Sequence, residues 1–200
     1  MSARRLMLYH ERKLTRQGKR RVAGVDEAGR GPLAGPVVAA AVILRDLRFK
    51  NRIADSKALT KLSRERAYEE ILRKADVGIG IVGEKYIDRV NILRASLHAM
   101  ELAVYDLGVK PDFLLIDGNI HPELPHPKAT IIDGESHSIS IACASIIAKV
   151  TRDFIMSYYD ILYPEYGFAR HKGYGTKLHF LAIRRFGPSP IHRRSFTLIK

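Results

Sequence analysis

Carboxylate residues follow three separate apolar runs of this sequence, and their type and placement suggest metal chemistry. Short runs of Val, Ile, Leu and Ala bounded by turn residues predict buried strands. Acids at the ends of adjacent strands form an oxygen-rich site that suits Mg²⁺ or Mn²⁺, and no Cys or His cluster favours zinc. Two such ions can activate a water and stabilise the leaving oxygen of a phosphodiester. The acids are Asp26, Glu27, Asp117, Asp133 and Glu135.

Glycines and prolines follow the first acidic pair closely. Neighbouring residues of a strand point to opposite faces, so Asp26 and Glu27 can serve one site only if the pleat breaks just after them. Five such residues between 29 and 36 are able to break it. The segment Gly29-Arg30-Gly31 can also offer main-chain N–H groups and a guanidinium to a phosphate.

The residue types alone leave plainer interpretations open. The segment 22–44 can be a surface hairpin whose acids are solvated and whose glycines only turn the chain. Asp117 can be a turn former before Gly118-Asn119, a role that Asp often has.

The elements that must position these acids alternate in an α/β order. We expect strands where short apolar runs occur and helices where apolar residues recur with a period of 3.6. Thr60 and Thr176 are good N-cap residues, and a long helix of small residues begins beyond Ser138. The expected strands are 22–25, 36–44, 77–81, 113–116 and 129–132, and the expected helices are 6–16, 60–75, 91–107, a segment from 138 and a segment from 176.

Composition predicts one domain spanning residues 1–200, with a basic N-terminal helix at about 6–16. Two hundred residues that are 46% hydrophobic can bury one sizeable core. The net charge of +13 is concentrated in residues 1–21 and 170–200, whereas the middle is close to neutral. This distribution suits a polyanion met by cationic flanks, although solvated charge that keeps the protein soluble is the alternative.

Cysteine content and hydropathy predict an intracellular, cytoplasmic protein that does not bind membranes. The lone Cys143 cannot form an internal disulfide, which fits a reducing compartment. The apolar stretch near the N-terminus is too short for a signal sequence, and no run approaches the length of a membrane span. We expect a monomer.

Several motifs in a fixed order resemble those of ribonuclease HII, the type 2 ribonuclease H family, over nearly the whole chain. The opening block DEAGRGPLAGPVVAAAV, residues 26–42, carries the first part of the resemblance. Later blocks are Asp55-Ser56-Lys57, Ile116-Asp117-Gly118-Asn119, Ala144-Ser145-Ile146-Ile147-Ala148-Lys149-Val150, Arg152-Asp153 and His171-Lys172-Gly173-Tyr174-Gly175-Thr176.

The resemblance implies a ribonuclease H-like mixed sheet flanked by helices, with a C-terminal helical lobe at about 160–200. It implies a metal-dependent endoribonuclease that cleaves RNA in RNA/DNA hybrids and cuts 5′ of single ribonucleotides in duplex DNA, leaving 3′-hydroxyl and 5′-phosphate ends. Asp26, Glu27 and Asp117 match three of the four acids of the family. The family usually has Gly-Asp where this chain has Gly134-Glu135, so Glu135 is the positional match and Asp133 the competing candidate.

The resemblance also implies a set of substrate contacts. Gly29, Arg30 and Gly31 would contact the ribonucleotide, and Tyr174 would stack on the neighbouring sugar at the step from RNA to DNA. From residue type alone, without the surrounding motif, the preferred interpretation of Tyr174 is a core tyrosine with its hydroxyl satisfied. The expected phosphate partners are Lys57, Lys149 and Lys172, each of which could instead be a solvated or structural lysine.

Other polar residues receive no role in catalysis. Asp153 is interpreted as a member of a structural ion pair. The three histidines of the C-terminal region lack a consistent metal-ligand spacing. They are His171, His179 and His192.

Two other functions stay open from the sequence: a basic nucleic-acid-binding protein without catalysis, and a ribonuclease H-like nuclease acting on DNA. Acids that converge where a phosphate should lie repel it unless a metal is bound, which argues against a pure binder. Gly29-Arg30-Gly31 and Tyr174 argue against an enzyme specific for DNA.

Overall fold

The computed structural model describes residues 7–54 and 56–198 of the chain. Its centre is a five-stranded sheet in the order β3-β2-β1-β4-β5. β1 pairs antiparallel with β2 and parallel with β4, which pairs parallel with β5, while β2 and β3 are antiparallel. The expected mixed sheet is therefore confirmed. The strands are β1 (Val22–Ala28), β2 (Val37–Leu44), β3 (Ala75–Val82), β4 (Phe113–Asp117) and β5 (Lys128–Ile131).

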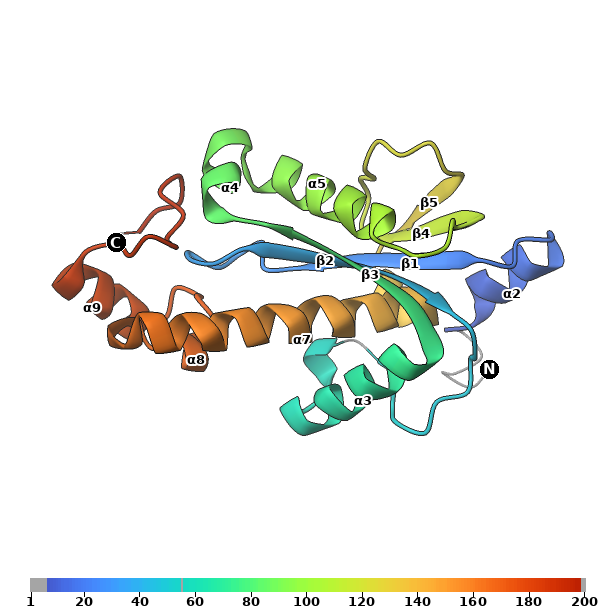
Figure 1. Ribbon diagram of the computed structural model, residues 1–200, viewed down its shortest axis with the longest axis horizontal. Coiled ribbons are helices and arrows are strands. Elements are labelled where there is room, and N and C mark those ends of the chain that lie inside the picture. The colour runs from blue at the N-terminus through green and yellow to red at the C-terminus, as the bar shows by residue number, and fades with distance from the viewer. Residues whose placement is uncertain (1–6, 55, 199–200) are drawn as a thin grey trace.

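Helices cover both faces of the sheet, with α5 on one face and α3 and α7 on the other (Figure 1). The alternation along β2 explains this arrangement, because Ala39 and Ala41 face α5 while Ala40 and Val42 face α7. In chain order, the helices up to the end of α7 are α2 (Tyr9–Arg16), α3 (Lys61–Lys74), α4 (Glu84–Val90), α5 (Ile92–Tyr105), α6 (Gly134–His137) and α7 (Ile139–Leu162), with a short 3-10 turn η1 (Ser56–Ala58) before α3.

Close helix-to-sheet approach depends on two glycines in the strands. A Cβ atom on Gly80 of β3 would lie 1.9 Å from the carbonyl oxygen of Ala99 in α5. A Cβ atom on Gly24 of β1 would lie 2.1 Å from the carbonyl carbon of Ser140 in α7. Both distances are too short for any side chain, so the second glycine allows α7 to lie directly against β1, two residues before the first acid.

The predicted N-caps are present. The Thr60 hydroxyl accepts a hydrogen bond from the N–H of Ser63 at the start of α3. The Thr176 hydroxyl does the same for α9 (Lys177–Phe186). Ser138, which was not predicted as a cap, has this role for α7. Side-chain oxygens thereby satisfy N–H groups that have no partner within their helices.

Several boundaries differ from the sequence-based expectation. Ala75 begins β3 rather than ending α3, and α5 ends at Tyr105, before the predicted end of its apolar stripe. The helices α4, α6 and α8 (Phe168–His171) were not predicted, because segments of four to seven residues are too short to show a helical period. Residue 6, where the first helix was expected to start, lies outside the described residues.

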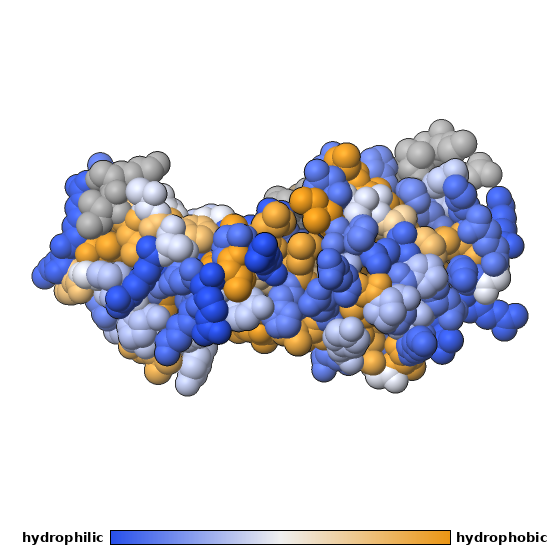
Figure 2. All heavy atoms as spheres, turned by 90° about the horizontal axis from the view of Figure 1, so that it is seen from above, coloured by the Kyte–Doolittle hydropathy of each residue, from blue (hydrophilic) through white to orange (hydrophobic). Residues whose placement is uncertain are grey.

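A helical C-terminal lobe continues from α7, as expected. It contains η2 (Pro164–Tyr166), α8 (Phe168–His171) and α9, and it encloses a separate core with Met156, Phe168 and Ile183. Figure 1 shows α7 passing beneath the sheet and on to the end of the molecule where α8 and α9 lie. In Figure 2, the outline is indented between that end, at the left, and the rest of the molecule.

Within the described residues, none of the helices combines the length and the apolar character needed to cross a membrane.

Candidate active site

A pocket of about 300 Å³ brings together residues that are far apart in the sequence. Acids from β1, β4 and α6 line it, together with the loop after β1, part of η1 and one side of α7. All four predicted acids are present, together with five of the predicted substrate residues. The lining residues are Asp26, Glu27, Ala28, Gly29, Arg30, Gly31, Ser56, Asp117, Glu135, Ser145, Lys149 and Tyr174.

The first acidic pair lies inside β1, which is longer than the expected strand 22–25, and the expected break follows just after the pair. The strand continues through Ala28, and only then does Gly29 adopt a φ of +102°. The pairing of β1 with β4 ends at Val25, so β1 has an open edge at Asp26 and Glu27. Because β4 ends at Asp117 and no longer pairs with β1 beyond Val25, the side chains of Asp26 and Glu27 can both reach the pocket although they leave β1 in different directions.

Asp117 stands at the end of β4 and is oriented by α6. Its Oδ1 atom accepts a 2.7 Å hydrogen bond from the N–H of Gly134. A Cβ atom on Gly134 would lie 2.6 Å from Ile141 and 3.1 Å from that same Oδ1, so only glycine fits here without a shift. The short helix α6 therefore brings its first N–H against the Asp117 carboxylate and orients it.

Of the two candidates for the fourth acid, only Glu135 lines the pocket. Its Oε2 atom accepts a 2.8 Å hydrogen bond from Ser145 of α7, whose Oγ lies 3.0 Å from the Oγ of Ser56. Because the Ser145 proton is directed to a carboxylate, Ser56 must donate to Ser145. Asp133 is exposed and has a left-handed backbone with φ of +53°.

The electrostatics of the pocket show that its carboxylates repel one another. Asp26 is 5% exposed, and burial raises its pKa well above the usual range, with further increases from the charges of Glu27, Asp117 and Glu135. Burial also raises the pKa of Glu27, which the neighbouring guanidinium of Arg30 opposes. An added positive charge among these groups would reverse the effect.

A divalent cation fits this donor set by its chemistry. The four carboxylates offer hard oxygen ligands, which Mg²⁺ and Mn²⁺ prefer. Among the described residues, no three side chains of Asp, Glu, His or Cys already converge as a finished metal site. The acids surround the pocket instead, in keeping with their mutual repulsion.

Two buried arginines hold the loop between β1 and β2. Arg193 donates to the carbonyl oxygens of Gly29, Arg30 and Gly35 at 2.6 to 2.9 Å. Arg152 of α7 donates to the carbonyl oxygens of Pro36, Lys172 and Ala34 at 2.9 to 3.1 Å. Burial lowers the pKa of Arg152 to about 10 and that of Arg193 to about 9. The loop is thus held in place by the hydrogen bonds that its carbonyl oxygens accept from the two arginines.

Tyr174 lies at the rim of the pocket beside the glycine-rich loop. A Cβ atom on Gly31 would lie 3.6 Å from its Cε1 atom, and the tyrosine is 45% exposed. The Arg30 side chain is 3.4 Å from Glu27 and about half exposed. The structure therefore places the aromatic ring and the guanidinium on the solvent side of the buried acids.

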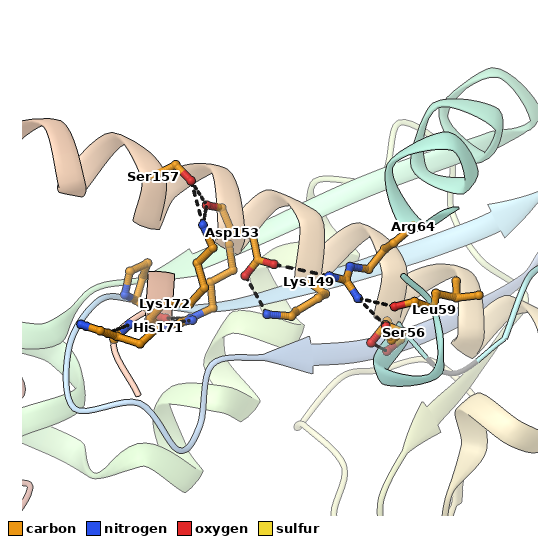
Figure 3. Close-up of polar contacts among 12 residues, drawn as sticks. Ser56, Leu59, Arg64, Lys149, Asp153, Ser157, His171 and Lys172 are labelled. Atoms are coloured by element: carbon orange, nitrogen blue, oxygen red, sulfur yellow. Dashed lines mark hydrogen bonds and ion pairs between the residues drawn. The ribbon is translucent and has the colours of Figure 1, made fainter. Parts of the chain in front are cut away.

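The predicted lysines have different surroundings. Lys149 lines the pocket and bonds Asp153 at 2.7 Å, and Asp153 also lies 3.9 Å from Arg64, so Asp153 does form ion pairs (Figure 3). Lys172 lines a neighbouring cavity between α3 and α7, where it donates to Ser157 at 2.8 Å. The side chain of Lys57 lies outside the described residues.

Taken together, the arrangement can bind cations among buried carboxylates and present a phosphate to them from a fixed loop. Fold and site together define a ribonuclease H-like nuclease.

Comparisons with known proteins agree with this class. The family model "Ribonuclease HII" matches residues 23–199. Ribonuclease HII of Geobacter sulfurreducens is 54% identical over 187 residues, covering 93% of this chain and 86% of the relative. Ribonuclease HII of Syntrophotalea carbinolica is 50% identical over 190 residues, covering 94% and 91%. The chain belongs to the ribonuclease HII family, a family of metal-dependent endoribonucleases.

Solved structures share the fold. The crystal structure of ribonuclease H2 from Pyrococcus horikoshii OT3 has a TM-score of 0.74 and 26% identity, and the match covers 89% of this chain and 94% of that one. A structure of Bst-RNase HIII in complex with Mn²⁺ has a TM-score of 0.64 and 17% identity, covering 89% and 67%. The predicted family, fold class and enzyme class are confirmed, while the roles of single residues stay predictions.

Sequence reasoning missed the residues that support the site. Ser145 could have been noticed as a polar residue within a run of small apolar ones, where a buried hydroxyl needs a partner. Arg193 gave no signal, because one arginine among the many of a basic C-terminal region cannot be recognised as buried from its type.

Proposed function

We propose that the protein hydrolyses the RNA strand of RNA/DNA hybrids, and cuts 5′ of single ribonucleotides in duplex DNA, with Asp26, Glu27, Asp117 and Glu135 as the ligands of two divalent cations. The observation that carries this proposal is that these four carboxylates line one pocket beside Gly29-Arg30-Gly31. Membership of the ribonuclease HII family supports the reaction.

When bound, such cations lower the pKa of water and stabilise negative charge at the phosphate that is cleaved. The residues of the chain provide the rest. Arg30 can donate to a phosphate oxygen, and the glycines on either side let the nucleic-acid backbone approach the loop. Tyr174 offers a flat apolar surface to the sugar that follows the ribonucleotide, and Lys149 adds positive charge at the edge of the pocket.

Mg²⁺ and Mn²⁺ are the ions we propose. The all-oxygen ligand set suits both, and a structural neighbour, Bst-RNase HIII, was solved in complex with Mn²⁺. A glutamate in place of the aspartate usual at position 135 can alter the preference between them, because Mg²⁺ tolerates little change in geometry.

We further propose that the protein works as a monomer in the cytoplasm. Its one cysteine, Cys143, is a buried thiol in the core between α7 and the sheet. This use of cysteine is typical of proteins from reducing compartments.

The test uses two DNA duplexes that differ only in one embedded ribonucleotide, together with an RNA/DNA hybrid. We expect metal-dependent cleavage of the hybrid and a single cut 5′ of the ribonucleotide, with Mg²⁺ and with Mn²⁺. Equal cleavage of the all-DNA duplex would instead support a nuclease acting on DNA, and binding of all three without cleavage would support a binding protein.

A further inference from the structure

Three histidines of the C-terminal lobe, two of them buried and His171 half-buried, form a cluster next to Tyr174 and outside the acidic pocket. His179 of α9 is fully buried, and His192 is 2% exposed. The rings of His171 and His179 are stacked, with 4.3 Å between their centroids. The proposed reaction uses none of the three, so their hydrogen bonds need another explanation.

These hydrogen bonds define which ring nitrogens carry protons. The carbonyl oxygen of Tyr174 lies 2.9 Å from Nδ1 of His179, and because a carbonyl can only accept, Nδ1 must carry a proton. In a neutral ring the Nε2 atom of His179 is then an acceptor. It lies 3.0 Å from Nε2 of His192, which must donate. Nδ1 of His192 in turn accepts from the N–H of Ser189 at 2.9 Å and lies 2.7 Å from its hydroxyl.

The resulting chain of hydrogen bonds runs in one direction, from Ser189 through His192 and His179 to Tyr174. Burial lowers the pKa of His179 and of His192 to about 4, so both rings are neutral near pH 7. Adding a proton to His179 would place two N–H groups face to face across the 3.0 Å contact. The chain is therefore complete only when both imidazoles are neutral.

This chain ends at the turn that carries Tyr174, and the turn contacts the loop of the pocket. The N–H of Leu33 donates to the carbonyl oxygen of Gly173 at 2.8 Å. His192 itself forms a β-bridge with Ala34 in the same loop. The segment around His192 is thus joined both to the turn of Tyr174 and to the loop of Arg30.

We propose that His192 and His179 are positioning residues for recognition of the ribonucleotide, because their hydrogen bonds fix the main chain of Tyr174 and hence its ring beside Gly31. The inference rests on the proposed function. Substitution of a residue that only stabilises the lobe would lower kcat/KM equally for all substrates and in all variants. Substitution of a positioning residue should lower kcat/KM only while Tyr174 is present.

A double-mutant cycle tests this connection. kcat and KM for a duplex with one ribonucleotide are measured for the parent, His192→Leu, Tyr174→Ala and the double variant. We expect His192→Leu to lower kcat/KM about tenfold in the parent, which corresponds to about 1.4 kcal/mol. In the Tyr174→Ala background the same substitution should change kcat/KM by less than about twofold.

Conservative variants add a control that does not depend on the leucine variants folding. His179→Asn keeps a donor near the position of Nδ1, and His192→Gln keeps one near Nε2, so both should retain most of the kcat/KM of the parent. In the parent, nitrogen NMR of the imidazoles at pH 7 should show a proton on Nδ1 of His179 and on Nε2 of His192.

The outcomes separate the inference from the proposed function. If the parent cuts the substrate but His192→Leu has equal effects in both backgrounds, the histidines only stabilise the lobe and the inference is wrong. The opposite tautomers in the NMR spectrum would also overturn it. Failure of the parent to cut any duplex that contains a ribonucleotide would instead contradict the proposed function.

Discussion

Glu135 is one methylene longer than the aspartate usual at its position, and its surroundings hold the longer side chain in place. Ser145 donates to its carboxylate, and Ser56 supports Ser145. Hydrogen bonds from neighbouring side chains orient metal-binding carboxylates in many sites. The departure from the family pattern therefore comes with a defined position inside the pocket.

The assignment of the fourth ligand is tested by two amide substitutions. Glu135→Gln should lower the cleavage rate severely, because an amide lacks the negative charge that helps to hold a second cation. Asp133→Asn should have a mild effect, since Asp133 is exposed and outside the pocket. Initial rates against Mg²⁺ and Mn²⁺ concentration decide, and strong loss in Asp133→Asn beside a healthy Glu135→Gln would move the ligand to Asp133.

Asp117→Asn should keep the fold and nucleic-acid binding while kcat falls by about a hundredfold or more. The amide retains the shape of the side chain, and its oxygen can still accept from the N–H of Gly134. Cleavage of a hybrid is measured beside the thermal unfolding temperature and the affinity for the same hybrid. A variant that cleaves at near the parent rate would show that Asp117 is not a ligand.

Two buried arginines, Arg152 and Arg193, keep the loop between β1 and β2 in one conformation. Among the described residues neither forms an ion pair, and each instead donates to three carbonyl groups. The fork of a guanidinium suits this use, because one side chain can satisfy several acceptors that point in different directions. The carbonyl groups of Gly29 and Arg30 are thereby turned inward, toward Arg193.

Arg193→Lys should lower the free energy of unfolding by about 2 to 4 kcal/mol, because one ammonium cannot satisfy all three carbonyl groups and each unsatisfied group costs about 1–3 kcal/mol. Urea denaturation measures the change. Arg194→Lys is the matched control, since Arg194 is the exposed neighbour, and it should change stability by less than about 0.5 kcal/mol. Equal stability of both variants would show that the hydrogen bonds of Arg193 contribute little.

The sequence indicates the elements of this fold better than it indicates their contacts. The caps Thr60 and Thr176 and the apolar runs of the strands follow from local chemistry, which acts between residues close in sequence. The continuation of β1 past Asp26 could not be foreseen, because it depends on pairing with β2. The chain from His192 to Tyr174 likewise depends on tertiary packing, which spacing along the sequence does not encode.

The described parts of the two basic regions lie at opposite ends of the long axis of the molecule. Figure 1 shows α2 at one end and α9 at the other. The pocket includes Tyr174, which lies shortly before the start of α9 at Lys177. The C-terminal basic region is therefore the one next to the pocket. A duplex bound at the pocket should therefore extend over the C-terminal lobe, and its phosphates should meet the exposed cations there.

Salt dependence of binding distinguishes the two ends. Each phosphate contact contributes about −0.9 to the slope of log affinity against log salt for duplex DNA. Removing Arg170, Lys177 and Arg185 together, each replaced by Gln, should reduce the magnitude of that slope by about 2 to 3. The same change at Arg12, Lys13 and Arg16 of α2 removes three exposed charges at the far end and should leave it nearly unchanged. Binding is measured by fluorescence anisotropy, and all variants carry Asp117→Asn so that the duplex is not cleaved during the measurement. Equal reductions from both triple variants would show that charge acts through the net value of the whole molecule, and not through contacts of the lobe with the duplex.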